Sequence, residues 1–234
     1  MGKKAYRLAI IKRLKSLANP KNVEGMARFG ISANNTLGIS LPVLRGIAKE
    51  IGKDHALALK LWASGIHEAR LLAAFVDDPA LVAEGQMEKW AGDFDSWDVC
   101  DQACTDLFDQ SPLAWKKASE WSSRKEEFVK RGAFALMAGL AVHDKKSPDS
   151  AFEAFFPIIA RESADERNFV KKAVNWALRN IGKRSEKLRA KAVARAREIR
   201  ENNPDSKAAK WIASDAIREL ESEAVKKRLA GKEK

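Results

Sequence analysis

Apolar residues recur at helical spacing along almost the whole chain, and this feature restricts the fold more than any other. One example is the stripe formed by Val43, Leu44, Ile47, Ala48 and Ile51. Alternating apolar and polar residues, the pattern of a half-buried strand, are almost absent. Strong helix formers dominate the composition, and only 13 Gly and 7 Pro are present to interrupt them. The sequence therefore predicts an all-α fold.

The predicted helices follow one another in pairs. Helices at 6–17 and 23–29 and a helix opening at Ser40 precede five pairs, at 55–64 with 67–76, 79–90 with 96–108, 112–122 with 126–143, 150–161 with 166–180, and 185–202 with 206–229. The second helices carry, at separations of 31, 30, 45 and 35 positions, the residues Arg70, Asp101, Arg131, Trp176 and Trp211. Helix pairs repeated at roughly this period are typical of HEAT-like solenoids.

We therefore expect residues 1–234 to form a single domain, a superhelical solenoid of antiparallel helix pairs of the HEAT-like or ARM-like type. The repeats share a rhythm and little sequence, so an irregular helical bundle is the alternative. The last ten or so residues are expected to fray as a basic tail. Four tryptophans on apolar helical faces are assigned to the core, namely Trp62, Trp90, Trp115 and Trp121.

Positive charge dominates the sequence, with 43 Lys and Arg against 32 Asp and Glu, a formal charge of +11. Such a surplus favours nucleic acid or an acidic membrane surface as a partner, although it can also serve solubility alone. No apolar run approaches the roughly 18 residues of a membrane helix, and no signal-peptide core follows the basic N-terminus. If the second helices line a concave face, their cations form a groove suited to double-stranded DNA.

Metal and cofactor chemistry find no support in the residue pattern. Cys100 and Cys104 are four positions apart, but no further Cys or His completes a metal set, and the three histidines form no motif. We expect a reduced, cytoplasmic, monomeric protein that is associated with the nucleoid through DNA and needs no metal or cofactor.

Trp97 and Asp101 are four positions apart, which places both side chains on one helix face. They lie within a segment, 93–109, that holds six aspartates and no Lys or Arg. In a basic protein this local reversal of charge needs a reason. Without further evidence, the tryptophan fits a core position. The other five aspartates fit helix caps or solvated surface groups.

Three segments in order give the chain a family resemblance. The spacing Trp97-x-x-x-Asp101 is followed by FVKRGAFAL with Arg131, and then by FVKKAVNWALR with Trp176. Together with the loop GISLPVLR that ends at Arg45, they resemble the AlkD-type DNA alkylation-repair glycosylases from about residue 10 to 220. The resemblance implies a HEAT-like fold and removal of cationic alkylated purines, such as 3-methyladenine and 7-methylguanine, from DNA.

The resemblance also implies the residues of the site. Asp101 matches the catalytic aspartate, Trp97 and Trp176 match tryptophans that flank the damaged nucleotide, and Arg131 matches an arginine of the same site. Arg179 looks like a phosphate ligand, and further DNA contacts are expected from Arg45, Lys171, Lys172, Lys183, Arg184 and Lys210. The alternatives are a catalytically silent relative that binds damaged or branched DNA, and a protein-binding HEAT scaffold.

Overall fold

The computed structural model describes residues 3–231, with side chains from residue 6 onward, and every regular element in that range is a helix. The prediction of an all-α fold is confirmed. The chain divides into two compact units, unit 1 (Met1–Pro112) and unit 2 (Leu113–Lys234). None of the helices in the described part of the chain combines the length and apolarity that crossing a bilayer requires.

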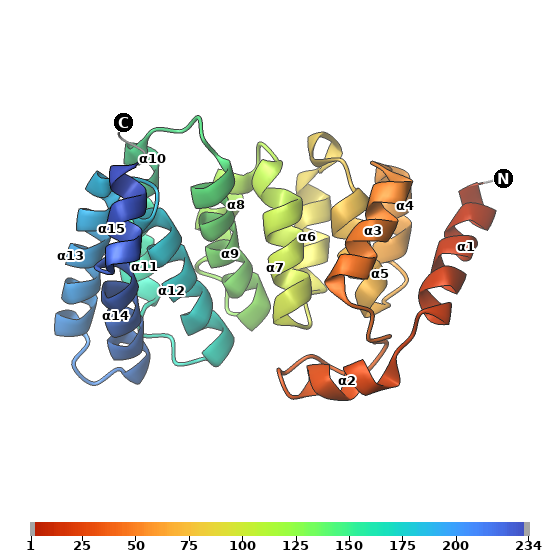
Figure 1. The fold of residues 1–234 in the computed structure, drawn as a ribbon, viewed down its shortest axis with the longest axis horizontal. Helices are drawn as coiled ribbons and strands as arrows, with labels where there is room; N and C mark the ends of the chain where they lie inside the picture. The colour runs from red at the N-terminus through yellow and green to blue at the C-terminus, as the bar shows by residue number, and fades with distance from the viewer. Residues whose placement is uncertain (1–2, 232–234) are drawn as a thin grey trace. The chain divides into compact units, whose positions relative to one another are not determined.

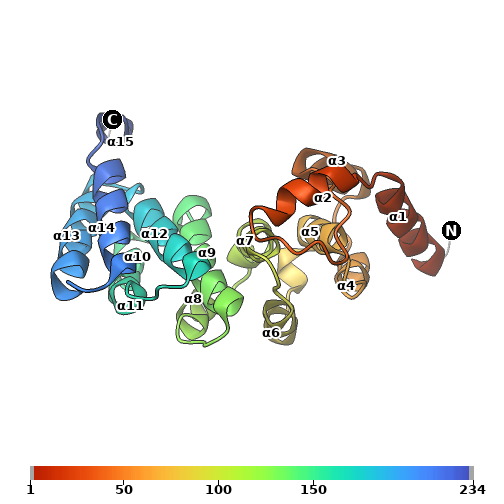
Figure 2. The same cartoon turned by 90° about the horizontal axis from the view of Figure 1, so that it is seen from below.

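Unit 1 holds a row of neighbouring helices, drawn from red to yellow-green in Figure 1. Its elements are α1 (Lys3–Ser16), α2 (Pro20–Ala27), α3 (Leu41–Ile51), α4 (His55–Trp62), α5 (His67–Val76), the short 3-10 helix η1 (Pro79–Leu81), α6 (Glu84–Gly92), α7 (Trp97–Asp106) and η2 (Phe108–Gln110). Helix α5 packs against both α3 and α7, and α4 pairs with α5. Within this unit, α4 and α6 lie on one side of the row and α2 on the other (Figure 2).

Unit 2 shows the expected helix pairs most clearly. Its elements are α8 (Ala114–Trp121), α9 (Glu127–His143), α10 (Asp149–Glu153), α11 (Phe155–Glu162), α12 (Asn168–Gly182), α13 (Glu186–Asn202), α14 (Lys207–Leu220) and α15 (Glu223–Ala230). The first helices α8, α11 and α13 pack on α9, α12 and α14, and α12 contacts both α9 and α14. The second helices of successive pairs are therefore neighbours, as in HEAT-like repeats.

The buried stripe of α12 explains why this helix takes the central place. Val170, Ala173, Val174, Ala177 and Leu178 are all fully buried, at a spacing of three and four residues. Burial of such a stripe on two neighbouring helices stabilises the pair by roughly 25 cal/mol for each square ångström of apolar surface.

Two predicted helices are each divided in the structure. The segment expected as one helix at 150–161 breaks at Ala154 into α10 and α11. The segment at 206–229 breaks after Leu220, because Ser222 starts a new helix by accepting a hydrogen bond from the backbone nitrogen of Val225. The helix expected over 23–29 begins earlier, at Pro20, because Asn19 caps it and Pro20 occupies its first position.

The expected basic tail is ordered further than predicted. Helix α15 continues to Ala230, and its Val225 and Leu229 side chains are 7% and 1% exposed. Apolar contacts with α13 and α14 hold this helix, so the prediction of fraying is wrong as far as Ala230. The last three residues of the predicted tail lie outside the described range.

Three of the four tryptophans assigned to the core are buried as predicted. Trp62, Trp90 and Trp121 are at most 2% exposed, and the rings of Trp62 and Trp90 stack with their centroids 3.9 Å apart. Trp115 is only half-buried, and its indole nitrogen donates a hydrogen bond of 3.2 Å to the half-buried Asp144.

Candidate nucleic-acid interface

Trp97 and Asp101 lie one turn apart on α7 of unit 1. The helix begins at Trp97, directly after Ser96, whose backbone is extended (φ −153°, ψ 156°). The indole nitrogen of Trp97 donates a hydrogen bond of 3.1 Å to the backbone oxygen of Phe29, in the loop that follows α2. Asp101 is 8% exposed, whereas the indole of Trp97 is half-buried. A nearly buried carboxylate therefore lies beside a partly accessible aromatic ring.

Four of the other five aspartates of this segment, Asp93, Asp95, Asp98 and Asp106, have partners within unit 1. Three of these partnerships are Asp93 with the Trp62 indole at 2.9 Å, Asp95 with Arg70 at 3.0 Å, and Asp106 with Arg45 at 2.9 Å. Asp98 and Asp109 are 7% and 6% exposed, so the expectation of caps or solvated groups is wrong for both. The acidic segment is thus largely explained by tertiary contacts.

A buried ion pair supports the start of α7. His67 Nε2 and Asp98 Oδ2 are 2.8 Å apart, and both side chains are nearly buried. Burial acts to lower the pKa of His67, but the hydrogen bond and the charge of Asp98 outweigh it and raise this pKa. Burial acts to raise the pKa of Asp98, and the same contacts lower it. Sequence reasoning missed this pair, because its residues lie on different helices and form no motif.

Glu68, the neighbour of His67, holds the loop between α2 and α3. Its fully buried carboxylate accepts hydrogen bonds from the backbone nitrogens of Leu37, Gly38 and Ile39 at 2.8, 2.6 and 3.3 Å. Gly38 has a φ of +76°, a region that favours glycine. The loop that carries part of the family resemblance is therefore fixed to α5.

Arg131 lies in unit 2, in the second turn of α9. Its side chain is nearly buried, and its Nη1 donates a hydrogen bond of 2.7 Å to the backbone oxygen of Phe169 in the first turn of α12. The arginine thus links the two central helices of this unit.

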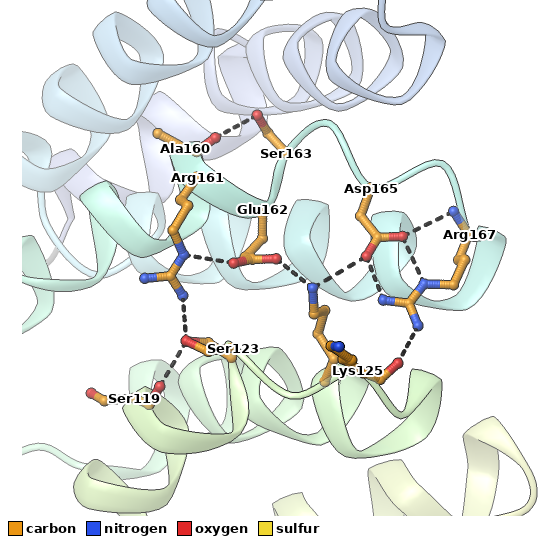
Figure 3. A network of polar contacts seen from close by, with 11 residues as sticks. Ser119, Ser123, Lys125, Ala160, Arg161, Glu162, Ser163, Asp165 and Arg167 are labelled. Atoms are coloured by element: carbon orange, nitrogen blue, oxygen red, sulfur yellow. Dashed lines mark hydrogen bonds and ion pairs between the residues drawn. The ribbon is translucent and has the colours of Figure 1, made fainter.

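A polar network also fixes the ends of these two helices (Figure 3). Lys130 of α9 pairs with Glu162 at 2.6 Å and with Asp165 at 3.4 Å. Arg167, directly before α12, pairs with Asp165 at 2.6 Å and donates to the backbone oxygen of Lys125 at 2.8 Å (Figure 3). The network joins the loop before α9 to the loop before α12 and so positions the helices that carry Arg131 and Trp176.

Trp176 lies on the exposed side of α12, among basic residues. Lys172, one turn before it, is exposed, and the indole of Trp176 is half-buried. Arg179 forms ion pairs with Asp215, at 3.5 Å, and with Glu219 of α14. Lys183 also pairs with Glu219, at 2.6 Å. The positive charge of the last turns of α12 is therefore partly balanced by α14.

The remaining predicted DNA contacts differ in their surroundings. Lys210 is exposed, and the Lys171 ammonium lies 5.6 Å from the centroid of the Trp211 ring. Arg45 is half-exposed and stacks over Phe75 at 4.4 Å. Whether these side chains reach DNA stays a prediction.

Arg184 was expected to contact DNA, but its side chain makes several contacts within unit 2. Its Nη1 donates to the backbone oxygens of Ala141 and Asp144 at 3.0 and 2.7 Å, and its guanidinium stacks over Phe152 at 3.8 Å. These contacts satisfy carbonyl groups at the C-terminal end of α9. Its main observed role is structural, and any phosphate contact would be additional.

The two cysteines of α7 are buried and not joined in a disulfide. Burial, together with contacts from Cys100, raises the pKa of the Cys104 thiol. Across the side chains that the structure describes, no group of three or more His, Cys, Asp or Glu is placed to hold a metal ion.

Comparison with known proteins identifies the family. Residues 10–220 match the sequence profile of the DNA alkylation repair enzymes. No curated protein matches the chain. One solved structure is similar, with a TM-score of 0.70, 21% sequence identity and 82% of each chain covered. It is described as a new family of proteins related to the HEAT-like repeat DNA glycosylases, with affinity for branched DNA structures. That likeness shows the HEAT-like fold, and the match over 10–220 shows that the chain belongs to the DNA alkylation repair enzyme family.

Proposed function

We propose that this protein binds double-stranded DNA and hydrolyses the N-glycosidic bond of positively charged alkylated purines, such as 3-methyladenine and 7-methylguanine. The product would be an abasic site. The observation that carries the proposal is the Asp101 carboxylate, 8% exposed and one turn from the Trp97 indole, on a helix that contains no Lys or Arg. Membership of the DNA alkylation repair family supports it.

The chemistry of such lesions needs one catalytic carboxylate. Alkylation of a purine ring nitrogen makes the base a cation and a good leaving group, so no general acid is required. As the bond to the base breaks, positive charge develops on the sugar, and Asp101 would oppose that charge and orient the attacking water. In a site shielded from solvent this effect is worth several kcal/mol, about a thousandfold in rate or more.

Trp97, Trp176 and Arg131 would position the substrate. The negative faces of the two indoles suit the C–H edges of a sugar and a cationic centre. Arg131 would contribute mainly by holding α9 to α12, given its hydrogen bond to Phe169. The exposed Lys172 and Lys210, with Lys171 and Arg179, would contact the DNA backbone, where cations contribute affinity without reading the sequence.

The decisive experiment compares the unmodified protein with Asp101→Asn on methylated duplex DNA. Release of 7-methylguanine is measured by chromatography, and DNA affinity is measured by fluorescence anisotropy. We expect Asp101→Asn to lose about a hundredfold or more in release rate while its Kd changes little. Asp95→Asn is the matched control, because it removes the charge of a more exposed carboxylate (56%) in the same segment.

Release at the parental rate by Asp101→Asn would exclude the proposed mechanism. Loss of both release and DNA binding would instead assign Asp101 to folding, and circular dichroism of the variant would reveal this.

A catalytically silent DNA-binding protein is the second candidate. The observation that favours it is the similar solved structure, whose family is related to the glycosylases and has affinity for branched DNA. Tight binding to a four-way junction by the unmodified protein, with no base release from methylated duplex, would support this candidate over the enzyme.

A further inference from the structure

A cationic depression lies in unit 2, at the C-terminal ends of α9 and α12. It has a volume of about 570 Å³ and is lined by Ala141, Val142, Lys145, Asn180, Lys183, Arg184 and Arg228. Four of the seven lining residues are cations, and none is acidic. The lining also lacks an aromatic ring, so the chemistry favours a small anionic group over a base or an apolar ligand.

A tight turn after α9 fixes the position of Lys145. The carboxylate of Asp144 accepts hydrogen bonds from the backbone nitrogens of Lys146 and Ser147, both at 2.9 Å, and from the Ser147 hydroxyl at 2.7 Å. Partial burial acts to raise the pKa of Asp144, but these bonds outweigh it and lower the pKa to about 2. The carboxylate therefore stays ionised and keeps the turn in place near neutral pH.

Arg228 lines the depression from α15, the helix in the segment that was expected to fray. Its Nη2 donates a hydrogen bond of 3.3 Å to the backbone oxygen of Lys183, at the end of α12. Figure 1 shows the loop after α9 at the same end of unit 2 as α15. In Figure 2, α15 lies on the side of this unit away from α8 and α11.

The four cations differ in how far nearby acids balance them. Lys183 is paired with Glu219, and Arg184 lies 3.9 Å from a carboxylate oxygen of Asp149. Among the described residues, no salt bridge joins Lys145 or Arg228 to a carboxylate. These two side chains therefore supply most of the unbalanced charge of the depression.

We propose that this depression binds a backbone phosphate of the DNA, with Lys145 and Arg228 as its main ligands and α15 as part of the DNA interface. The inference rests on the proposed function and extends it to Lys145 and Arg228, two residues that the proposed site does not include. Lys183, the C-cap of α12, follows Trp176 by seven positions, an axial rise of about 10 Å, or about three base-pair steps of B-DNA. A strand that passes Trp176 can therefore continue into the depression.

The test compares two double variants that remove the same charge from the same two segments. Lys145→Ala/Arg228→Ala removes the proposed ligands, and Lys146→Ala/Lys227→Ala removes their sequence neighbours, which do not line the depression. The Kd for duplex DNA is measured between 50 and 200 mM salt for both variants and the unmodified protein, and thermal unfolding checks that each variant is folded.

We expect the first variant to bind about five- to tenfold more weakly and to lose about 0.9 from the slope of log K against log salt, the loss for one phosphate contact. The control variant should stay within about twofold of the parent. Equal weakening of both variants, with tight binding by the parent, would overturn the inference alone.

A titration with inorganic phosphate, followed by NMR, separates a DNA contact from a site for free anions. Saturable phosphate binding that the first variant abolishes, together with unchanged DNA affinity, would overturn the inference in favour of a small-anion site. No DNA binding by the unmodified protein would overturn the proposed function and this inference together.

Discussion

The buried pair of His67 and Asp98 is the clearest residue-scale determinant of the candidate site. It joins the first turns of α5 and α7 next to Trp97, and Glu68 on the same turn of α5 holds the loop before α3. Removing one partner of such a pair leaves a buried group without its counter-charge, which costs roughly 3–5 kcal/mol. The position of Trp97 thus depends on residues that would not themselves contact DNA.

The pair predicts a specific pH dependence of stability. The pKa of His67 is raised above 6.5, so its contribution is complete below about pH 6.5 and is lost as the pH rises through the raised value. The pKa of Asp98 is lowered below 3.8, so its contribution is lost only as the pH falls through that lower value. We expect His67→Gln to lower the free energy of unfolding by about 3 kcal/mol at pH 5.5, and by less at pH 8.5.

Urea unfolding at several pH values measures this difference, with His143→Gln, at an exposed position, as the control. A destabilisation by His67→Gln that is the same at pH 5.5 and pH 8.5 would contradict the charged pair.

At the scale of elements, the loop between α2 and α3 shows how local sequence and tertiary contacts combine. The segment from residue 30 to 40 holds two glycines and two asparagines, residues typical of turns, and the structure has a loop there. The loop also lies close to Asn19, whose backbone nitrogen donates a hydrogen bond of 2.7 Å to the backbone oxygen of Leu37. Local sequence does not predict this contact, which depends on the tertiary fold. The break between α14 and α15 is similar, because the cap at Ser222 is local but the burial of Leu229 is not.

Substitution of two glycines separates the contribution of a tertiary contact to stability from that of local helix propensity. A Cβ at Gly38 would lie 2.2 Å from the backbone oxygen of Asn19, at a φ of +76°, so Gly38→Ala should lose about 3 kcal/mol or more of unfolding free energy. A Cβ at Gly46, within α3, meets nothing within 4 Å, so Gly46→Ala should gain about 0.5–1 kcal/mol. Urea unfolding tests both, and a Gly38→Ala variant as stable as the parent would show that the approach to Asn19 is not required.

At the scale of the whole molecule, the formal charge of +11 dominates the expected behaviour with DNA. Many of the cations are balanced in ion pairs, such as Arg179 with Glu219 and Arg45 with Asp106. Lys172 and Lys210 are exposed to solvent. Net charge alone therefore overstates the number of phosphate contacts, which a salt titration counts directly.

With about six phosphate contacts, the affinity for duplex DNA should fall about a thousandfold between 50 and 200 mM salt. Fluorescence anisotropy across that range measures the effect. A fall of less than about tenfold would indicate one or two phosphates and would favour a scaffold that binds something other than DNA.

The sequence by itself determined the helices, their pairing and the family. Helix periodicity is set by neighbours three and four positions apart, so α5 was predicted at 67–76, where the structure has His67–Val76. The family resemblance could also be predicted, because it rests on the order of Trp97, Asp101, Arg131 and Trp176 along the chain.

Only the tertiary structure decided which charges are balanced and which helix ends meet. The sequence suggested that Asp98 is a surface acid, but in the structure it pairs at 2.8 Å with His67, which is 31 positions away along the chain. The sequence placed Arg228 in a loose tail, but in the structure it belongs to α15 and donates a hydrogen bond at the end of α12. The physical reason is that electrostatic partners are selected by distance in space and by burial, and neither is encoded in local spacing.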